Sequence, residues 1–411
     1  MRSGTSGAIV RNAAAGILAV TEKDRPLDDF LDGCPEELRR SVSHLLFSYF
    51  RHKRFLDKIL AERLEKPPRP PVYALLRAAA AQLVFQSAIA PESAVNVAVD
   101  AAKALHASGL VNAVLRRVLE HKSPAPDTPE KVLPAPLFAA WKKRFTAEEL
   151  AEQTEVLLTE PLFSFRVCRD FSPPEGAAAL PGWGNFRYFA AAAPGEVLAS
   201  EAFRRGELYV QDPATSLAPS LPDYTQVNSA LELCAAPGGK TLMLAEKLKR
   251  NAKLVAADRS AKRQERTRAN CAKYGVAAEV IAAEPRELSG SFDLVVADVP
   301  CGNSGVFRRR PDAMWRYSPE RQKELAELQM SILDEAARLV SPGGQLVYSS
   351  CSIEPEEDDG LVAAFLRKHG EFRLLKSRLL LPSPVNDGAF AALLMKVQGL
   401  PVQGFKGRGE A

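Results

Sequence analysis

The spacing of apolar residues changes twice along this chain of 411 residues. As far as about residue 121, apolar positions recur every three or four residues, which places them on one face of a helix. One of these helices is expected to start at Pro91, because proline suits the first turn of a helix. Residues 1–122 are therefore predicted to form an all-α domain.

Prolines then interrupt the helical pattern. Residues 123–136 contain five of them, a composition that favours extended chain, so this segment is predicted to be a linker. Beyond it, a short helix is expected to carry Trp141. Thr146 and Glu149 match the capping-box pattern with which a helix begins.

Farther along, apolar and polar residues alternate, as in strands. The stretches around Phe165 and Tyr188 are the clearest examples. Residues 137–210 are predicted to form a small α+β subdomain. An α/β domain over residues 211–400 and a flexible tail over residues 401–411 are expected to follow.

Short apolar segments alternate with helical ones in the α/β domain, as expected for a parallel sheet covered by helices. The predicted strands are residues 231–233, 253–257, 278–282, 292–297 and 345–348. The predicted fold class is multidomain, with an all-α N-terminal domain, a small α+β subdomain and a Rossmann-like α/β domain.

Two cysteines follow predicted strands of this domain. Cys301 and Asp298 come after residues 292–297, and Cys351 comes after residues 345–348. Open α/β sheets bind their ligands at the carboxyl ends of their strands. Two thiols and one carboxylate are therefore expected in a single cleft.

A glycine turn follows the first predicted strand of the domain. Residues 234–240 read Cys-Ala-Ala-Pro-Gly-Gly-Lys, and a helix over residues 240–248 is predicted next. Such glycines let the backbone approach a ligand, and the helix start presents unpaired N–H groups. Asp258 ends the second strand, where dinucleotide folds bind ribose hydroxyls. The turn matches neither Gly-x-Gly-x-x-Gly nor a P-loop, which indicates an adenosyl ligand without a pyrophosphate.

These motifs, in this order, resemble those of the S-adenosylmethionine-dependent RNA cytosine-5 methyltransferases. The matching stretches are the glycine turn, residues 298–301 (Asp-Val-Pro-Cys), residues 350–352 (Ser-Cys-Ser), residues 308–312 and residues 387–390. The resemblance implies S-adenosylmethionine as cofactor. The cofactor-binding residues expected here are Cys234, Ala235, Ala236, Pro237, Gly238, Gly239, Lys240, Asp258, Glu284 and Asp298. Glu284 stands where the family has an aspartate.

The front of the chain resembles the NusB domain of the bacterial Sun (RsmB-type) rRNA methyltransferases. The matching stretches are residues 75–83, 95–99 and 110–117. This second resemblance implies RNA binding and small-subunit (16S) rRNA as the partner, with tRNA as a rival substrate.

The net charge and its distribution along the chain agree with a polyanionic partner. The net charge of the chain is +4, and residues 1–125 carry 18 Lys and Arg against 13 Asp and Glu. The residues predicted to contact RNA phosphates are Arg51, Lys53 and Arg54 in the helical region and Arg308, Arg309 and Arg310 beside the Pro-Cys motif. The alternative interpretation of each cluster is a solvated surface.

Methyl transfer to carbon 5 of cytosine explains the need for a thiol. A thiolate adds at carbon 6, and the resulting enamine then attacks the methyl group. Asp298 is expected to hydrogen-bond the base, which must be unstacked to react. Spacing alone does not identify the nucleophile. The resemblance implies Cys351, with Cys301 assisting product release, whereas DNA cytosine methyltransferases use the Pro-Cys position.

Besides Glu284, three other departures from the family pattern are present. Glu232 replaces the usual aspartate, Val299 replaces an alanine, and residues 302–305 read Gly-Asn-Ser-Gly in place of Ser-Gly-Thr-Gly. None of these changes removes a reacting group.

Several classes of protein are disfavoured. The six cysteines form no Cys-x-x-Cys pair, so neither a metal site nor a disulfide framework is expected. The absence of an apolar run of about 18–20 residues argues against a membrane span, and a cytoplasmic monomer is expected. A non-catalytic RNA-binding assembly factor that retains the cofactor fold stays an alternative. An amino-group methyltransferase is disfavoured because its Asn/Asp-Pro-Pro-aromatic motif is missing.

Overall fold

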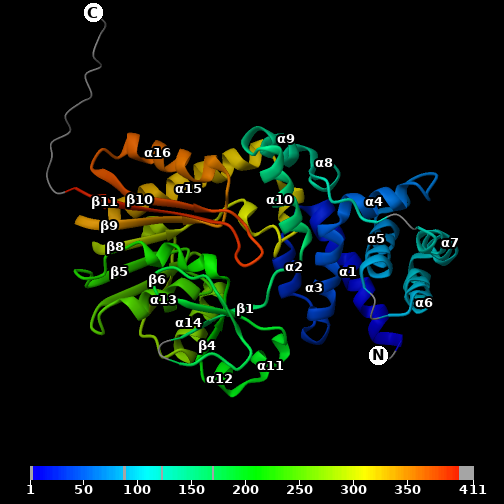
Figure 1. The fold of residues 1–411 in the computed structure, drawn as a ribbon, viewed down its shortest axis with the longest axis horizontal. Helices are drawn as coiled ribbons and strands as arrows, with labels where there is room; N and C mark the ends of the chain where they lie inside the picture. Colours follow the sequence, from blue (N-terminus) through cyan, green and yellow to red (C-terminus); the bar gives the residue numbers. More distant parts are fainter. Residues whose placement is uncertain (1–2, 87–88, 122–123, 169–170, 398–411) are drawn as a thin grey trace, which may run out of the picture. The chain divides into compact units, whose positions relative to one another are not determined.

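The chain divides into two compact units (Figure 1). The computed structural model describes residues 3–86, 89–121, 124–168 and 171–397, so the tail predicted at 401–411 lies outside the described residues. The helical unit comprises the chain as far as Glu160 together with Phe307–Ser318. The sheet unit comprises Pro161–Val306 and the chain from Pro319 onward.

The helical unit is built around α5, whose apolar side chains face helices on several sides. Its alanines from Ala78 to Ala81 are all buried, and their small side chains allow α1, α3, α6 and α7 to pack closely. The helices are α1 (Ser3–Lys23), α2 (Leu27–Asp32), α3 (Glu36–Arg51), α4 (Lys53–Ala61), α5 (Pro70–Phe85), α6 (Pro91–Ala102), η1 (Lys103–Leu105), α7 (Ser108–Leu119), α8 (Pro129–Val132), α9 (Ala135–Arg144), α10 (Ala147–Leu158) and η6 (Ala313–Arg316). The predicted helix start at Pro91 is confirmed.

Helices α9 and α10 pack with the helical unit, although the sequence placed their residues in the α+β subdomain. The capping box of Thr146 and Glu149 is present at the start of α10. Within the predicted linker, α8 forms one turn of helix. Trp141 of α9 explains the packing, because it is fully buried and its ring stacks on Phe307 with centroids 6.2 Å apart.

Hydrogen bonds join the segment Phe307–Ser318 to the rest of the helical unit. The Leu27 N–H donates to the Asp312 carboxylate at 3.1 Å. The Arg51 guanidinium donates to the Arg308 carbonyl at 2.9 Å, and the Trp315 indole N–H donates to the Phe50 carbonyl at 2.7 Å. These contacts hold a stretch that is distant in sequence from the rest of its unit.

We expect Trp141→Ala to lower the free energy of unfolding by about 3–5 kcal/mol, because it removes a fully buried indole and leaves a cavity against Phe307. Urea unfolding followed by circular dichroism measures the change. The control is Leu110→Ala on α7, where the side chain is exposed and the expected change is within about 0.5 kcal/mol. Equal effects of the two substitutions would contradict the packing described above.

The sheet unit begins with a small antiparallel sheet in the order β2-β3-β1-β4. Its elements are β1 (Ser164–Val167), β2 (Ala178–Leu180), β3 (Arg187–Ala190), α11 (Pro194–Ala199), α12 (Glu201–Arg204) and β4 (Leu208–Val210). The strands predicted around Phe165 and Tyr188 are confirmed as β1 and β3, and both side chains are buried.

The larger sheet has seven strands in the order β10-β11-β9-β8-β5-β6-β7. Its strands are β5 (Ser229–Leu233), β6 (Lys253–Asp258), β7 (Glu279–Ala282), β8 (Phe292–Asp298), β9 (Val340–Ser350), β10 (Phe372–Leu380) and β11 (Ala389–Lys396). Strands β5 to β9 pair in parallel, and β11 runs antiparallel to β9 and β10. All five predicted strands are confirmed.

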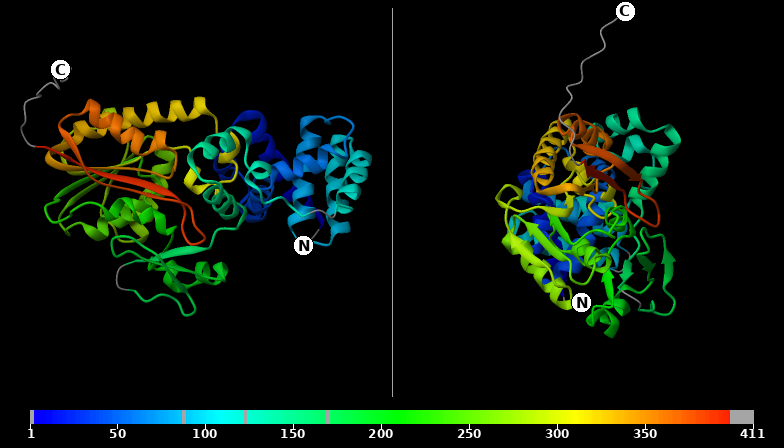
Figure 2. Two further views of the ribbon diagram at one scale, coloured as in Figure 1. Left: turned by 45° about the horizontal axis from the view of Figure 1, so that its top comes forward. Right: turned by 90° about the vertical axis from the view of Figure 1, so that its left-hand side faces the viewer.

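Helices cover both faces of this sheet (Figures 1 and 2). One face carries α13 (Gly239–Lys247) and α14 (Ala261–Lys273), and the other carries α15 (Pro319–Leu339) and α16 (Asp359–Lys368). Shorter turns are η2 (Pro213–Ser216), η3 (Ala218–Ser220), η4 (Pro285–Glu287), η5 (Ser304–Val306) and η7 (Pro355–Glu357). Because β5, β6, β8 and β9 are parallel, the loops that follow them share one edge of the sheet. The predicted Rossmann-like α/β domain is confirmed.

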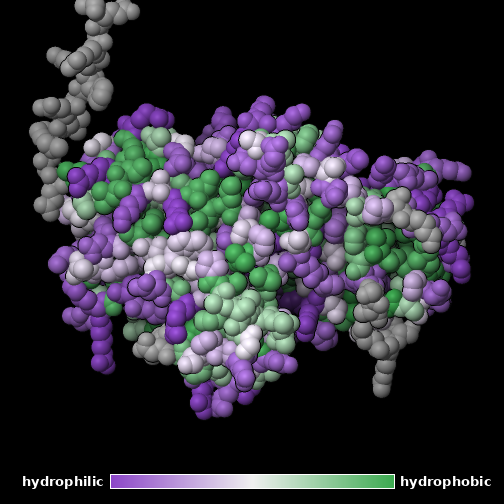
Figure 3. Space-filling model, in the orientation of Figure 1, coloured by the Kyte–Doolittle hydropathy of each residue, from purple (hydrophilic) through white to green (hydrophobic). Residues whose placement is uncertain are grey.

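Hydrophilic side chains are distributed over both units on the face drawn in Figure 3. Among the helices that the structure describes, none combines the length and hydropathy that crossing a membrane requires.

Candidate active site

The glycine turn after β5 adopts the conformation that close approach to a ligand requires. Gly238 has φ +96° and precedes the first residue of α13. A side chain there would be strained, and its Cβ would lie 3.0 Å from the Thr267 side chain. Cys234 also has a positive φ, +56°, and burial raises the pKa of its thiol to about 12. Because its thiol stays protonated, Cys234 suits a structural role in the turn better than the role of a reacting group.

Asp258, at the end of β6, ties the glycine turn to the next strand. Its buried carboxylate accepts from the Ser260 N–H at 2.9 Å and from the Ala236 N–H at 3.3 Å. The Arg263 guanidinium lies 3.5 Å from the same carboxylate and donates to the Ala236 carbonyl at 2.7 Å. The structure therefore brings together the predicted cofactor residues of the first two strand ends.

Glu284 follows β7, and its N–H donates to the Glu287 carboxylate at 2.8 Å. Its neighbour Ala283 donates to the Asp258 carbonyl at 3.1 Å, which places Glu284 next to the Asp258 strand end. The half-buried side chain takes part in a capping box at the start of η4. A cofactor contact of Glu284 stays a prediction.

Lys240, Asp298 and Ser349 bring α13, β8 and β9 together. The Lys240 ammonium donates to one oxygen of Asp298 at 2.7 Å, and the Ser349 hydroxyl donates to the other, also at 2.7 Å. Burial would lower the pKa of Lys240, but the adjacent Asp298 carboxylate raises it on balance. Lys240 therefore stays protonated, and its ammonium and the Ser349 hydroxyl hold the Asp298 carboxylate in place.

The sulfur atoms of Cys301 and Cys351 lie 2.8 Å apart. The Cys351 thiol donates to the Asn303 side-chain carbonyl at 3.3 Å, and the Asn303 amide donates to the Cys301 carbonyl at 3.1 Å. The hydrogen bond with Cys351, followed by burial, raises the pKa of Cys301 well above its usual range. The predicted meeting of the two thiols at the edge of the sheet is confirmed.

Asn303 is a site residue that sequence reasoning missed. It adopts a left-handed conformation, φ +62°, which asparagine tolerates better than most residues. The signal was present in the departure of residues 302–305 from the family pattern, where an amide side chain replaces a glycine. That side chain could be placed against Cys351 only once the loop conformation was known.

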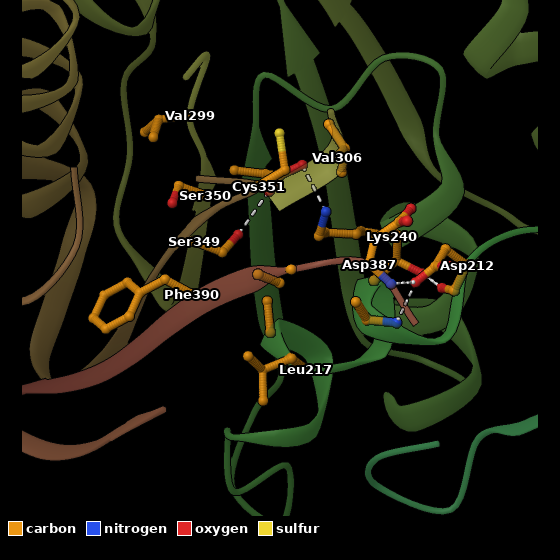
Figure 4. Close-up of a pocket in the computed structure, with 16 residues that line it drawn as sticks. Asp212, Leu217, Lys240, Val299, Val306, Ser349, Ser350, Cys351, Asp387 and Phe390 are labelled. Carbon is orange, nitrogen blue, oxygen red and sulfur yellow. Dashed lines mark hydrogen bonds and ion pairs between the residues drawn. The ribbon is translucent and has the colours of Figure 1, made fainter. Parts of the chain in front are cut away.

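A small cavity of about 100 Å³ lies beside these groups (Figure 4). Its lining includes Asp212, Leu217, Lys240, Val306, Ser349, Cys351, Asp387 and Phe390. Figure 4 shows Cys351, Ser349 and Lys240 around one side of the cavity, with Asp212 and Asp387 close together. The cavity thus combines a cysteine, a half-buried cation and apolar walls.

Asp212 and Asp387 were also missed as site residues. One carboxylate oxygen of Asp212 accepts from the Ala214 N–H at 2.9 Å and from the Asp387 N–H at 3.0 Å. This contact joins the start of the α/β domain to the segment before β11. The stretch 387–390 matched the family, but its position beside the cavity follows from the antiparallel pairing of β11 with β9.

Two glycines allow the cysteine loops to pack closely. The Gly305 N–H donates to the Cys351 carbonyl at 3.0 Å, and the Gly388 N–H donates to the Gly305 carbonyl at 2.7 Å. A Cβ on Gly305 would lie 2.6 Å from the Gly388 carbonyl oxygen, closer than real Cβ contacts come. Only glycine therefore fits at position 305 without moving the loop.

The arginines predicted to bind RNA have different surroundings. Arg51 and Arg308 are only 5% and 2% exposed, so we correct their assignment from RNA contact to packing within the helical unit. Lys53 pairs with Asp57 at 2.8 Å, and Arg54 donates to two backbone carbonyls, those of residues 130 and 133.

Near the Pro-Cys motif, exposed Arg310 pairs with Asp28 at 2.9 Å, and Arg309 is half-buried. RNA contact stays a prediction for Lys53, Arg54, Arg309 and Arg310.

Glu232 lies under the site with its side chain 1% exposed, and Thr241 donates its hydroxyl to the carboxylate. Burial raises the pKa of Glu232 from 4.5 to about 8. The folded chain therefore binds this proton more tightly than the unfolded chain, and the stability so gained is lost as pH rises from about 4.5 through about 8.

Glu232→Gln is expected to weaken the decline of unfolding free energy between pH 5.5 and pH 8, because the amide does not titrate. The free energy of unfolding, measured by urea unfolding at both pH values, gives the size of this decline. Glu265→Gln, an exposed change on α14, is the control and should follow the wild type. An unchanged pH dependence in Glu232→Gln would contradict the expectation.

Two family models match the chain. The model described as 16S rRNA methyltransferase RsmB/F matches residues 217–398, and the NusB family model matches residues 9–120. The NusB match falls within the helical unit, and the RsmB/F match covers most of the sheet unit together with Phe307–Ser318.

Curated relatives match nearly end to end. The ribosomal RNA small subunit methyltransferase B of Shewanella oneidensis is 30% identical over 395 residues, which covers 88% of this chain and 90% of that protein. The protein of the same name from Thermus thermophilus is 31% identical over 385 residues, covering 91% and 90%.

Solved structures share the fold. The crystal structure of PH0851 has a TM-score of 0.77 at 23% identity and covers 96% of this chain and 99% of that one. The structure of NSun6 from Pyrococcus horikoshii with SFG has a TM-score of 0.53 at 20% identity, covering 65% and 99%.

Proposed function

Because this chain belongs to the RsmB/F family of 16S rRNA methyltransferases, we propose that it methylates carbon 5 of a cytosine in small-subunit rRNA through a covalent cysteine adduct. The observation that carries the proposal is the placement of two thiols 2.8 Å apart at the sheet edge where Lys240 holds the Asp298 carboxylate. Methylation of an amino group or of a hydroxyl needs no such pair of thiols.

The cofactor in this proposal is S-adenosylmethionine, and the residues present fit it. The buried Asp258 carboxylate at the end of β6 suits a ribose diol, and the left-handed turn at Gly238 leads into the N–H groups at the start of α13. When bound, S-adenosylmethionine supplies an electrophilic methyl group.

Cys351 is the nucleophile of the proposed reaction. Its thiolate forms a bond to carbon 6 of the base, and the electron pair of the 5,6 double bond becomes available at carbon 5 for methyl transfer. Cys351 is among the residues that line the cavity, whereas Cys301 is not. Asp298, held by Lys240 and Ser349, accepts a hydrogen bond from the exocyclic amino group of the cytosine and so orients the base for attack.

Cys301 assists release of the product. Once carbon 5 is methylated, its proton passes to a water molecule, the electron pair of that carbon–hydrogen bond restores the 5,6 double bond, and the carbon–sulfur bond breaks with its electron pair going to the Cys351 sulfur. The raised pKa of Cys301 keeps its thiol protonated, so it competes poorly as a nucleophile and can donate to the Cys351 sulfur.

The RNA is bound in part by the helical unit, which matches the NusB family model over residues 9–120. A base in a duplex is out of reach of a thiol that attacks from above its ring, so the substrate cytosine must be unstacked. An unpaired loop of the rRNA satisfies this requirement at the smallest cost.

The test is to incubate the full-length protein with methyl-labelled S-adenosylmethionine and 16S rRNA, small-subunit particles or tRNA, and to map 5-methylcytosine. A single modified cytosine in 16S rRNA supports the proposal. Modification of tRNA alone would show that the substrate is tRNA and not 16S rRNA. Cofactor binding without methylation of any RNA would overturn the proposal in favour of a non-catalytic assembly factor.

A further inference from the structure

A buried carboxylate lies behind the two cysteine loops and has no part in the reaction described above. Glu357 is the last residue of η7, and its side chain is fully buried. It is not among the residues that line the cavity. A carboxylate in such a place costs free energy unless its oxygens accept hydrogen bonds.

The oxygens of Glu357 accept from both cysteine loops. One oxygen accepts from the Gly302 N–H at 2.8 Å, and Gly302 directly follows Cys301. The other oxygen accepts from the Ser352 hydroxyl at 2.8 Å, and Ser352 directly follows Cys351. A single side chain therefore joins the residues next to the two thiols.

Gln329 of α15 extends the same network. Its amide donates to the Glu357 carboxylate at 2.7 Å and to the carbonyl of Pro300, the residue before Cys301, at 3.0 Å. The Tyr348 hydroxyl lies 3.0 Å from the Gln329 side-chain oxygen, which orients the amide toward Glu357. The Cys301 loop is thus held from both sides of the cysteine.

We infer that Glu357 is a positioning residue that holds the Cys301 and Cys351 loops at a fixed separation, so that both thiols reach the same base. The inference rests on the proposed function, because it concerns the thiols that this function uses. Groups that act together must keep their geometry, and a displacement of about 1 Å can cost about 100-fold in rate.

Two substitutions separate this role from simple packing. Glu357→Ala removes all three acceptor contacts, whereas Glu357→Gln keeps the shape of the side chain and one oxygen. Glu356→Ala, a change at the exposed neighbouring glutamate, is the matched control. Gln329→Ala removes a donor to the same network that lies on a different element, α15. It replaces Glu357→Ala in the test if that variant does not fold.

The first measurement is methyl transfer to rRNA. We expect kcat to fall about 100-fold in Glu357→Ala and less in Glu357→Gln, with the KM for RNA and the affinity for S-adenosylhomocysteine within about twofold of the wild type. None of the hydrogen bonds of Glu357 described above involves residues 234–240 or Asp258, which are predicted to bind the cofactor. Gln329→Ala and Glu357→Ala together should be less than additive, because they break one network.

The second measurement reports the separation of the thiols without any methyl transfer. Phenylarsine oxide bridges two close thiols, and peptide mapping locates the bridge. We expect it to join Cys301 and Cys351 in the wild type and in Glu356→Ala, and to bind at least about tenfold more weakly in Glu357→Ala, a change of about 1.4 kcal/mol.

Folded Glu357→Ala with kcat and arsenical affinity equal to those of Glu356→Ala would overturn the inference. If Glu357→Ala does not fold, unchanged kcat and arsenical affinity in Gln329→Ala would overturn it instead. Loss of arsenical bridging in a protein that methylates no RNA would support the positioning role and refute the proposed function, so the two failures are distinguishable.

Discussion

Cys351→Ala is expected to abolish methylation of 16S rRNA, with a loss on the order of 10⁴-fold or more in kcat, as when the nucleophile of a covalent enzyme is removed. Alanine cannot add to carbon 6 of the base, and without that addition carbon 5 is too weak a nucleophile to take the methyl group. The neighbouring Cys301 does not substitute, because its raised pKa keeps it protonated.

Transfer of labelled methyl groups to rRNA measures this loss, and calorimetric binding of S-adenosylhomocysteine checks that the cofactor site is intact. Cys34→Ala, which removes a buried thiol of the helical unit, is the control and should retain activity. Activity within tenfold of the wild type in Cys351→Ala would show that another group is the nucleophile.

Cys301→Ala is expected to trap the RNA on the protein. Cys351 can still add to the base, but release loses the thiol that lies 2.8 Å from its sulfur. Loss of assistance to proton transfer typically costs about 10²–10⁴-fold, and turnover should fall within that range. The adduct should appear as a protein–RNA band that survives denaturing electrophoresis.

The double variant Cys301→Ala/Cys351→Ala is the control, since it lacks the sulfur that forms the adduct. A band of equal strength in the double variant would show that the linkage does not involve Cys351. Full turnover in Cys301→Ala would remove Cys301 from the mechanism.

Much of the sheet and its edge could be predicted from the sequence, because strand ends are marked by local patterns. Runs of apolar residues identified β5 to β9, and the parallel order of such strands placed Asp298, Cys301 and Cys351 at one edge. The turn at Gly238 was readable for the same reason, since its residues lie next to one another in the chain.

Contacts between distant segments could not be predicted in this way. The basic cluster at Arg51 suggested a surface, but the guanidinium is buried against the Arg308 carbonyl, 257 residues away in sequence. Nothing in the local sequence marks Glu357 as buried, yet three donors from separate elements surround its carboxylate. The helical spacing of apolar residues predicted α9, but it did not indicate which of the two units α9 packs with.

The return of Phe307–Ser318 to the helical unit has a consequence for limited proteolysis. A single cut after Glu160 separates the chain into two pieces, but the second piece still contains Trp315 and Asp312, which are bonded to Phe50 and Leu27 of the first. The fragments would therefore travel together through gel filtration under native conditions. They would separate only in denaturant, as two noncovalently complementing halves of one enzyme.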